Sequence, residues 1–267
     1  MLEPEWILIF LLLGSFVGFM AGLLGIGGGG ILVPILTSIF ISHGIPVDNV
    51  VHLALGTSMA SMVITTFSSF RSHNAKGAVV WKAVRGMVPG IIIGTFSATF
   101  LASYLSSLFL GVFFALFMAF VSSQMFLNKK PKPSREVSGN MGLFAAGSGI
   151  GAISALVSIG GGSLTVPYLT WQNIEIKKAI GTSAAIGLPI AIAGTIGYLV
   201  NGWNISSSDN YIFGYVYLPA VILISLTSFI TAPYGAQLAH KLPVSILKKI
   251  FAVLLVCLSI KMLVSIS

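Results

Sequence analysis

Long stretches without a single charged residue dominate this chain and limit what it can fold into. A membrane-crossing helix needs about 20 consecutive apolar residues, and several of these stretches are as long or longer. The uncharged stretches are residues 6–24, 53–70, 86–127, 141–174, 179–208 and 211–239. Only 7% of the 267 residues are charged, whereas soluble domains carry about 25%. We therefore predict an all-α, polytopic integral membrane protein.

The N-terminal segment and the cysteine content exclude some alternatives. The first residues, MLEPEW, hold two glutamates and no basic residue, while a cleavable signal peptide begins with positive charge. We therefore expect residues 6–24 to form a retained first span. The single cysteine, Cys257, leaves neither an intramolecular disulfide nor a multi-cysteine metal site.

Two parts of the chain repeat one another. The stretch LLGIGGGGILVPIL at 23–36 is similar to LVSIGGGSLTVPYL at 156–169. Further along, ALGTSMA at 54–60 is similar to AIGTSAA at 179–185. Because the two motifs share order and spacing, we predict two copies of one unit. The copies are residues 1–127 and 141–267, joined by the hydrophilic linker 128–140.

Each copy is expected to contain five helical segments, the second of which is too short to cross a membrane. In the first copy the segments are predicted at about 5–25, 31–41, 52–70, 84–104 and 107–127. In the second copy they are predicted at about 141–158, 164–172, 179–200, 214–236 and 246–265.

The basic residues indicate the orientation. If every segment reverses the chain, all lysines and arginines except Lys261 fall on one side, and Asp48 and Asp209 fall on the other. The positive-inside rule places the basic side in the cytoplasm. We therefore predict a plasma (inner) membrane protein with both termini outside and a cytoplasmic linker. The net charge of +8 reflects this orientation and does not indicate nucleic-acid binding.

Five reversals in each copy place the second copy upside down relative to the first. Inverted repeats are common in secondary transporters, whose substrates bind near the midplane between the repeats. The predicted fold is thus two inverted repeats of about five helical segments each. A broken or re-entrant helix pair is expected at the Gly-rich loop of each half.

The glycine-rich loops lie where the first long segment of each copy meets the short one. Glycine weakens a helix and permits a tight turn, so the chain should break there. The short helix then starts near Gly30 and Ser163, or at Pro34 and Pro167, since proline suits the first helical position. Free amides at such a helix start can bind an anion. The loop residues predicted to bind it are Gly27, Gly28, Gly29, Gly30, Gly160, Gly161, Gly162 and Ser163.

The GTS motifs add hydroxyl groups to this prediction. Thr57 and Ser58 in the first copy, with Thr182 and Ser183 in the second, can converge on the two-fold axis of an inverted repeat. The predicted membrane interior holds no Asp, Glu, Arg or Lys except Lys261, so dipoles and hydroxyls would hold the anion. Small residues also line ordinary helix contacts in membranes, and this second interpretation stays open.

The doubled motif, GIGGGGILVPIL with SIGGGSLTVPYL, each followed by GTS, resembles the sulfite exporter TauE/SafE family, also called the toluenesulfonate uptake permeases. The resemblance covers nearly the whole chain. It implies a plasma-membrane transporter of small sulfur anions, such as sulfite, sulfonates or sulfoacetate. By this resemblance, residues 27–30 and 160–163 match the glycine motif of the family, with Ser163 where the first copy has Gly30.

The predicted function is therefore secondary transport of a small sulfur-containing anion by alternating access, with export as the expected direction. No nucleotide-binding GxxxxGK[ST] motif is present, and neither a cofactor nor enzymatic activity is expected. One alternative is an intramembrane serine hydrolase, which requires a Ser–His pair within hydrogen-bond reach. Another is a transporter of a metal cation, which requires intramembrane carboxylates or Met/His clusters. The substrate, the coupling ion and the oligomeric state stay open.

Overall fold

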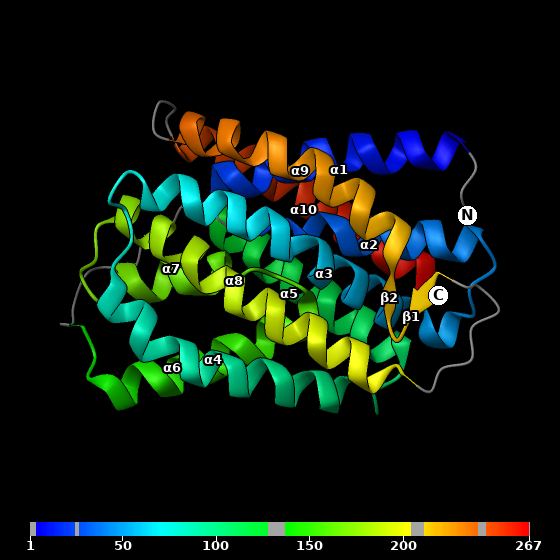
Figure 1. The fold of residues 1–267 in the computed structure, drawn as a ribbon, viewed down its shortest axis with the longest axis horizontal. Coiled ribbons are helices and arrows are strands. Elements are labelled where there is room, and N and C mark those ends of the chain that lie inside the picture. The colour runs from blue at the N-terminus through cyan, green and yellow to red at the C-terminus, as the bar shows by residue number, and fades with distance from the viewer. Residues whose placement is uncertain (1–3, 25–26, 128–136, 204–210, 240–243, 267) are drawn as a thin grey trace.

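The structure, a computed structural model, describes residues 4–24, 27–127, 137–203, 211–239 and 244–266. Within these residues, ten helices and one β-hairpin form an elongated bundle (Figure 1). The helices are α1 (Pro4–Leu24), α2 (Gly29–Ser42), α3 (Val47–Asn74), α4 (Trp81–Ala102), α5 (Ser107–Phe126), α6 (Asn140–Val157), α7 (Gly162–Trp171), α8 (Ile176–Asn201), α9 (Leu218–Ala239) and α10 (Val244–Ile266).

Most of these helices have the length of a membrane span. Seven are long and apolar enough to cross a bilayer, namely α1, α3, α4, α5, α6, α8 and α9. The short helices α2 and α7 have 14 and 10 residues, and α10 has 23. The prediction of an all-α polytopic membrane protein is therefore confirmed, and each predicted segment contains a helix.

The hairpin before α9 is not anticipated in the sequence. It pairs β1 (Ile212–Phe213) with β2 (Val216–Tyr217) through a tight turn at Gly214, whose φ of +54° suits glycine. The helix predicted over 214–236 therefore begins only at Leu218. Because Tyr217 is fully buried, the hairpin is part of the packed structure.

The helices pair across the two predicted copies. The most extensive contacts join α1 with α9 and α4 with α6, and α3 pairs with α8 and α5 with α10. Small residues permit this close approach. A Cβ atom on Gly18 of α1 would collide with the backbone of Ser228 in α9, and one on Gly147 of α6 would meet the carbonyl group of Met87 in α4. Helices of one predicted copy therefore pack closely against helices of the other.

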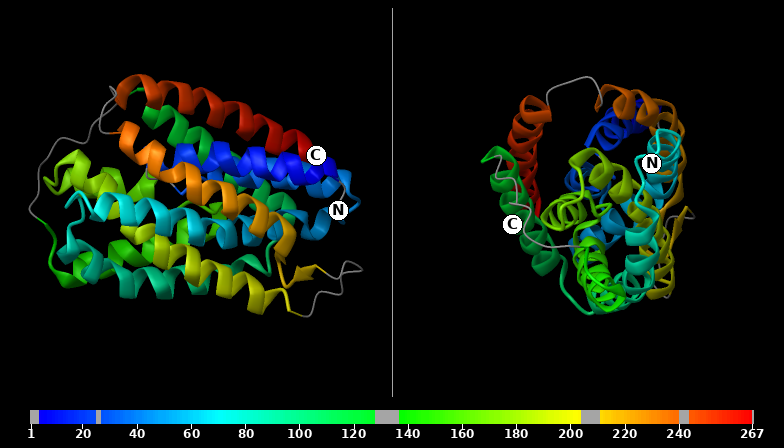
Figure 2. Two further views of the ribbon diagram at one scale, coloured as in Figure 1. Left: turned by 45° about the horizontal axis from the view of Figure 1, so that its top comes forward. Right: turned by 90° about the vertical axis from the view of Figure 1, so that its left-hand side faces the viewer.

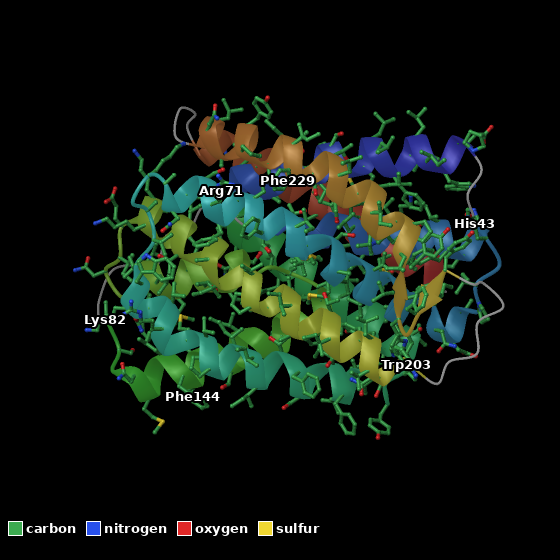
Figure 3. The ribbon with its side chains drawn as sticks, viewed as in Figure 1. His43, Arg71, Lys82, Phe144, Trp203 and Phe229 are labelled. Atoms are coloured by element: carbon green, nitrogen blue, oxygen red, sulfur yellow. The ribbon has the colours of Figure 1, made fainter. Side chains whose placement is uncertain are left out.

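Equivalent helices of the two copies run in opposite directions. Helix α1 starts at the end of the bundle where α10 finishes, whereas α6 starts at the other end (Figures 1 and 2). His43 and Trp203 lie toward the first end, and Arg71 and Lys82 lie toward the other (Figure 3). This arrangement is compatible with an inverted repeat, and the division into two copies stays a prediction. Residues 128–136 of the predicted linker lie outside the described residues.

Candidate functional site

Each short helix begins directly after a glycine in the left-handed conformation. Gly28, with φ +82°, precedes α2, and Gly161, with φ +77°, precedes α7. Positive φ is costly for residues with a Cβ atom, which explains the glycines at these places. The predicted starts at Gly30 and Ser163, or at the prolines, are wrong. Since left-handed glycines end the loops, the helices begin earlier, and the prolines lie inside them.

The two glycine loops touch each other inside the bundle. A Cβ atom on Gly160 would lie 3.0 Å from the Cα of Gly27, and one on Gly27 would lie 2.9 Å from the Cα of Gly160. Both glycines are buried. Met62 of α3 covers the contact, because its Cε would lie 2.5 Å from a Cβ on Gly27. The broken helices of the two copies therefore meet at one place.

Ser158 connects the second loop to the first copy. Its hydroxyl donates to Ser58 Oγ at 2.9 Å and lies 3.7 Å from the Met62 sulfur. Its carbonyl oxygen presses against Gly29, the first residue of α2, where any Cβ atom would collide with it. Ser58 and Ser158 are both fully buried. One predicted hydroxyl, that of Ser58, thus lies beside a glycine loop.

The threonines of the GTS motifs contact the chain just before the fourth helix of the opposite copy, which is α9 for Thr57 and α4 for Thr182. Thr57 Oγ1 accepts a hydrogen bond from the amide of Tyr217 at 2.9 Å, immediately before α9. Thr182 Oγ1 accepts from the amide of Val80 at 2.9 Å, immediately before α4, and donates to the carbonyl of Lys178. The starts of α9 and α4 lie at opposite ends of the bundle (Figure 1). The structure therefore does not bring the two threonines together.

The other predicted site residues lie in the glycine loops, at the helix starts or, for Ser183, in α8. Gly28 contacts Val17, and Gly30 contacts Met118 of α5. The Ser183 hydroxyl donates to the carbonyl of Ile180 at 2.8 Å. The remaining ones lie at the start of α7, where Gly161 and Gly162 are buried and Ser163 is half-buried.

The loops and short helices carry no charged side chain. Residues 27–42 and 158–174 contain no Asp, Glu, Lys or Arg. The first amides of a helix have no acceptor within it and carry its positive partial charge. Two such helix starts meet here, where burial strengthens electrostatic attraction relative to water. The arrangement can attract a small anion. Because no Lys or Arg side chain holds that anion with a full positive charge, the anion can also be released.

A Ser–His pair is present, but its hydrogen bonds hold helices together. His52 Nδ1 lies 3.3 Å from Ser107 Oγ. The Ser107 hydroxyl donates to the carbonyl of Asp48 at 2.6 Å, and His52 Nε2 lies 3.0 Å from the carbonyl of Ala102. The imidazole stacks on Tyr215, whose pKa is raised by burial, so this phenol stays neutral. The pair joins the α4–α5 turn to α3, and the serine proton is not directed at the imidazole.

Metal ligands do not cluster in the described part of the chain. No three side chains of His, Cys, Asp or Glu there lie close enough together to hold a metal ion. Two residues at the loops, Met62 and Ser158, are absent from the sequence-based prediction. The repeat points to both positions, because the aligned residues of the two copies differ there: Met62 aligns with Gly187, and Ser158 aligns with Gly25. The two copies therefore differ in side chain at the points where the loops meet.

Comparison with known proteins gives a consistent result. Residues 10–262 match the family model described as "Sulfite exporter TauE/SafE". A probable membrane transporter protein of Haemophilus influenzae is 38% identical over 258 residues, covering 96% of this chain and 98% of the relative. A probable membrane transporter protein of Bacillus subtilis is 27% identical over 250 residues, covering 91% and 92%. A third, from Methanocaldococcus jannaschii, is 27% identical over 251 residues, covering 90% of each chain. No solved structure matches the chain.

Proposed function

Because this chain belongs to the sulfite exporter TauE/SafE family, we propose that it is a secondary transporter that exports a small sulfur-containing anion, such as sulfite or an organosulfonate. The family and the curated relatives establish the coarser function, a multi-pass membrane transporter. The anion, the direction of transport and the site are the proposal.

The contact between the two glycine loops is the observation that carries the proposal. Gly27 and Gly160 touch where two short helices begin, one from each predicted copy. The proposed site comprises residues 27–30 and 160–163 with Ser58 and Ser183. Thr57 and Thr182 contribute by holding the chain before α9 and α4. Such starts of broken helices suit anionic substrate groups in transporters with inverted repeats.

The proposed orientation follows from the charges at the ends of the bundle. Arg71 and Lys82 lie toward one end (Figure 3), which the positive-inside rule assigns to the cytoplasm. Both termini and Asp48 then lie outside the inner membrane. Transport would proceed as one copy rocks against the other about the contact between the loops.

Flux measurements on purified protein in liposomes test the proposal. Liposomes loaded with sulfite, an organosulfonate, sulfate or chloride are diluted, and efflux is followed with and without the protein. We expect selective efflux of a sulfur oxyanion and at least a tenfold lower rate for Gly160→Ala. A methyl group there requires the two loops to separate.

Gly139→Ala is the matched control, because this exposed glycine before α6 has nothing within 4 Å of an added Cβ atom. It should transport at the wild-type rate. Efflux of no sulfur anion by the wild type would refute the proposed function. Full activity of Gly160→Ala would refute the assignment of the site.

A further inference from the structure

The two short helices differ in how deeply they are buried. In α2 every residue from Gly29 to Pro34 is buried. In α7 Gly162 and Thr165 are buried at the corresponding turn, while Ser163 and Val166 are half-buried and Pro167 is exposed. Helix α2 packs against α3 and α10, whereas the extensive contacts of α7 are with α8. The first turns of α2 are therefore fully buried, whereas α7 has one partly exposed side, and Thr165 is buried on the other side of the helix.

Helix α7 lies among the longer helices of the bundle. The right-hand view of Figure 2 shows α7, in yellow-green, surrounded by the longer helices. The viewer looks from the end that carries Arg71 and Lys82. Seen from the basic end of the protein, α7 therefore lies on the inner side of the ring of long helices.

Thr165 places an unused hydroxyl at the start of α7. The residue is fully buried, and its Oγ1 atom has no hydrogen-bond partner among the described residues. Side chains of a helix tilt toward its N-terminus, and Thr165 Oγ1 would lie 3.1 Å from a Cβ atom on Gly161, the residue that precedes α7. A buried polar group without a partner costs free energy. A ligand that accepts this hydrogen bond would remove the cost.

The first copy offers no equivalent donor, and its helix start is covered. The residue of α2 that aligns with Thr165 is Leu32. The carbonyl oxygen of Ser158 presses on Gly29, and the sulfur of Met62 would lie 2.8 Å from a Cβ atom there. In the second copy Met62 aligns with Gly187, and the side chains that lie against Gly161 are those of Ile190 and Thr165, at 3.0 and 3.1 Å from a Cβ atom there. The two starts are thus chemically different.

We propose that the anion binds asymmetrically, at the start of α7, where the Thr165 hydroxyl donates a hydrogen bond to one of its oxygen atoms. The amides of Gly162 and Ser163, the first of the helix, face the other oxygens. Thr165 is then a specificity-determining residue that favours oxyanions such as sulfite and sulfonates. This inference rests on the proposed function. It adds Thr165 to the binding residues and places the anion at the start of α7.

Binding to the purified full-length protein in detergent tests this inference. Calorimetric titration with sulfite and with ethanesulfonate gives the dissociation constant for the wild type and its variants. Thr165→Val keeps the shape and removes the hydroxyl, so we expect affinity to fall by about tenfold or more. Thr165→Ala should show the same loss, and Thr165→Ser should bind within about threefold of the wild type.

Thr37→Val provides a matched control. Thr37 lies in α2, and it is fully buried, with a hydroxyl that likewise has no partner in the described part of the chain. It lies away from the helix start, so its loss should leave binding unchanged. The unliganded Thr165→Val protein should melt at the same temperature as the wild type or higher, because an unpaired buried hydroxyl is removed.

The outcomes separate the inference from the proposed function. Wild-type binding of sulfite or ethanesulfonate, with unchanged affinity in Thr165→Val, would overturn the role of Thr165 and leave the function intact. Equal weakening by Thr37→Val would overturn it as well. If the wild type binds no sulfur oxyanion, the proposed function itself fails, and the inference fails with it.

Discussion

At the scale of single residues, the threonines of the two GTS motifs have the same structural role in the two predicted copies. Thr57 and Thr182 each accept a backbone hydrogen bond from the residue that precedes the fourth helix of the other predicted copy. The repeated GTS motif predicts contact of these hydroxyls with a ligand, with ordinary helix packing as the open alternative. Their partners are backbone amides of distant segments, and no local pattern in a sequence identifies those.

Replacing Thr57 by valine should destabilise the protein. The amide of Tyr217, which is fully buried, would lose its acceptor, at a cost of about 1–3 kcal/mol. Thermal unfolding in detergent should show a lower midpoint. Thr95→Val is the matched control, because Thr95 is fully buried with no hydrogen-bond partner for its hydroxyl among the described residues. The structural role of Thr57 would be contradicted if both variants melted alike.

At the scale of helices and strands, hydropathy and the doubled motif predict the number and order of segments well. Apolar length decides whether a segment crosses a bilayer, and this property is local. The starts of α2 and α7 are set by left-handed glycines, so the side-chain preferences at Gly30 and Ser163 misplaced them. The hairpin at 212–217 is too short to show a pattern of its own. Which helices pair also depends on glycines spread along α1, α4 and α6, and spacing alone does not assign their partners.

Two glycines of α6 test the importance of close helix packing. A Cβ atom on Gly147 would meet the carbonyl oxygen of Met87 in α4, whereas one on Gly149 has open space within 4 Å. Gly147→Ala should therefore lower the free energy of unfolding by about 1–3 kcal/mol. Gly149→Ala should raise it by about 0.5–1 kcal/mol, because alanine favours a helix. Unfolding midpoints in detergent compare the two, and a destabilised Gly149→Ala variant would argue against this account.

At the scale of the whole molecule, opposed helix directions and basic residues at one end lead to a specific topology. Helix α3 extends from Val47 to Asn74, and the exposed residues Asp48 and Lys76 lie at its two ends. The proposed inverted repeat requires these ends to face opposite sides of the membrane.

Cysteine labelling in intact cells tests this topology. The single native cysteine, Cys257, is exposed, so Cys257→Ser gives a background without thiols. In that background, a membrane-impermeant maleimide should label Asp48→Cys without permeabilisation and Lys76→Cys only after it. Labelling of both from outside would rule out the proposed orientation.

The pairing of α1 with α9 also has a consequence for biosynthesis. Helix α1 is the first to be made, and the helix that covers its glycine-lined face is completed roughly 215 residues later, which is about 10–40 s at ordinary rates of translation. During that interval α1 must be held by lipid or by the insertion machinery, with its closest partner still unmade. A ribosome that stops after α5 leaves a product in which α1 and α4 both lack their main neighbours. Such truncated chains should be prime substrates for membrane proteases.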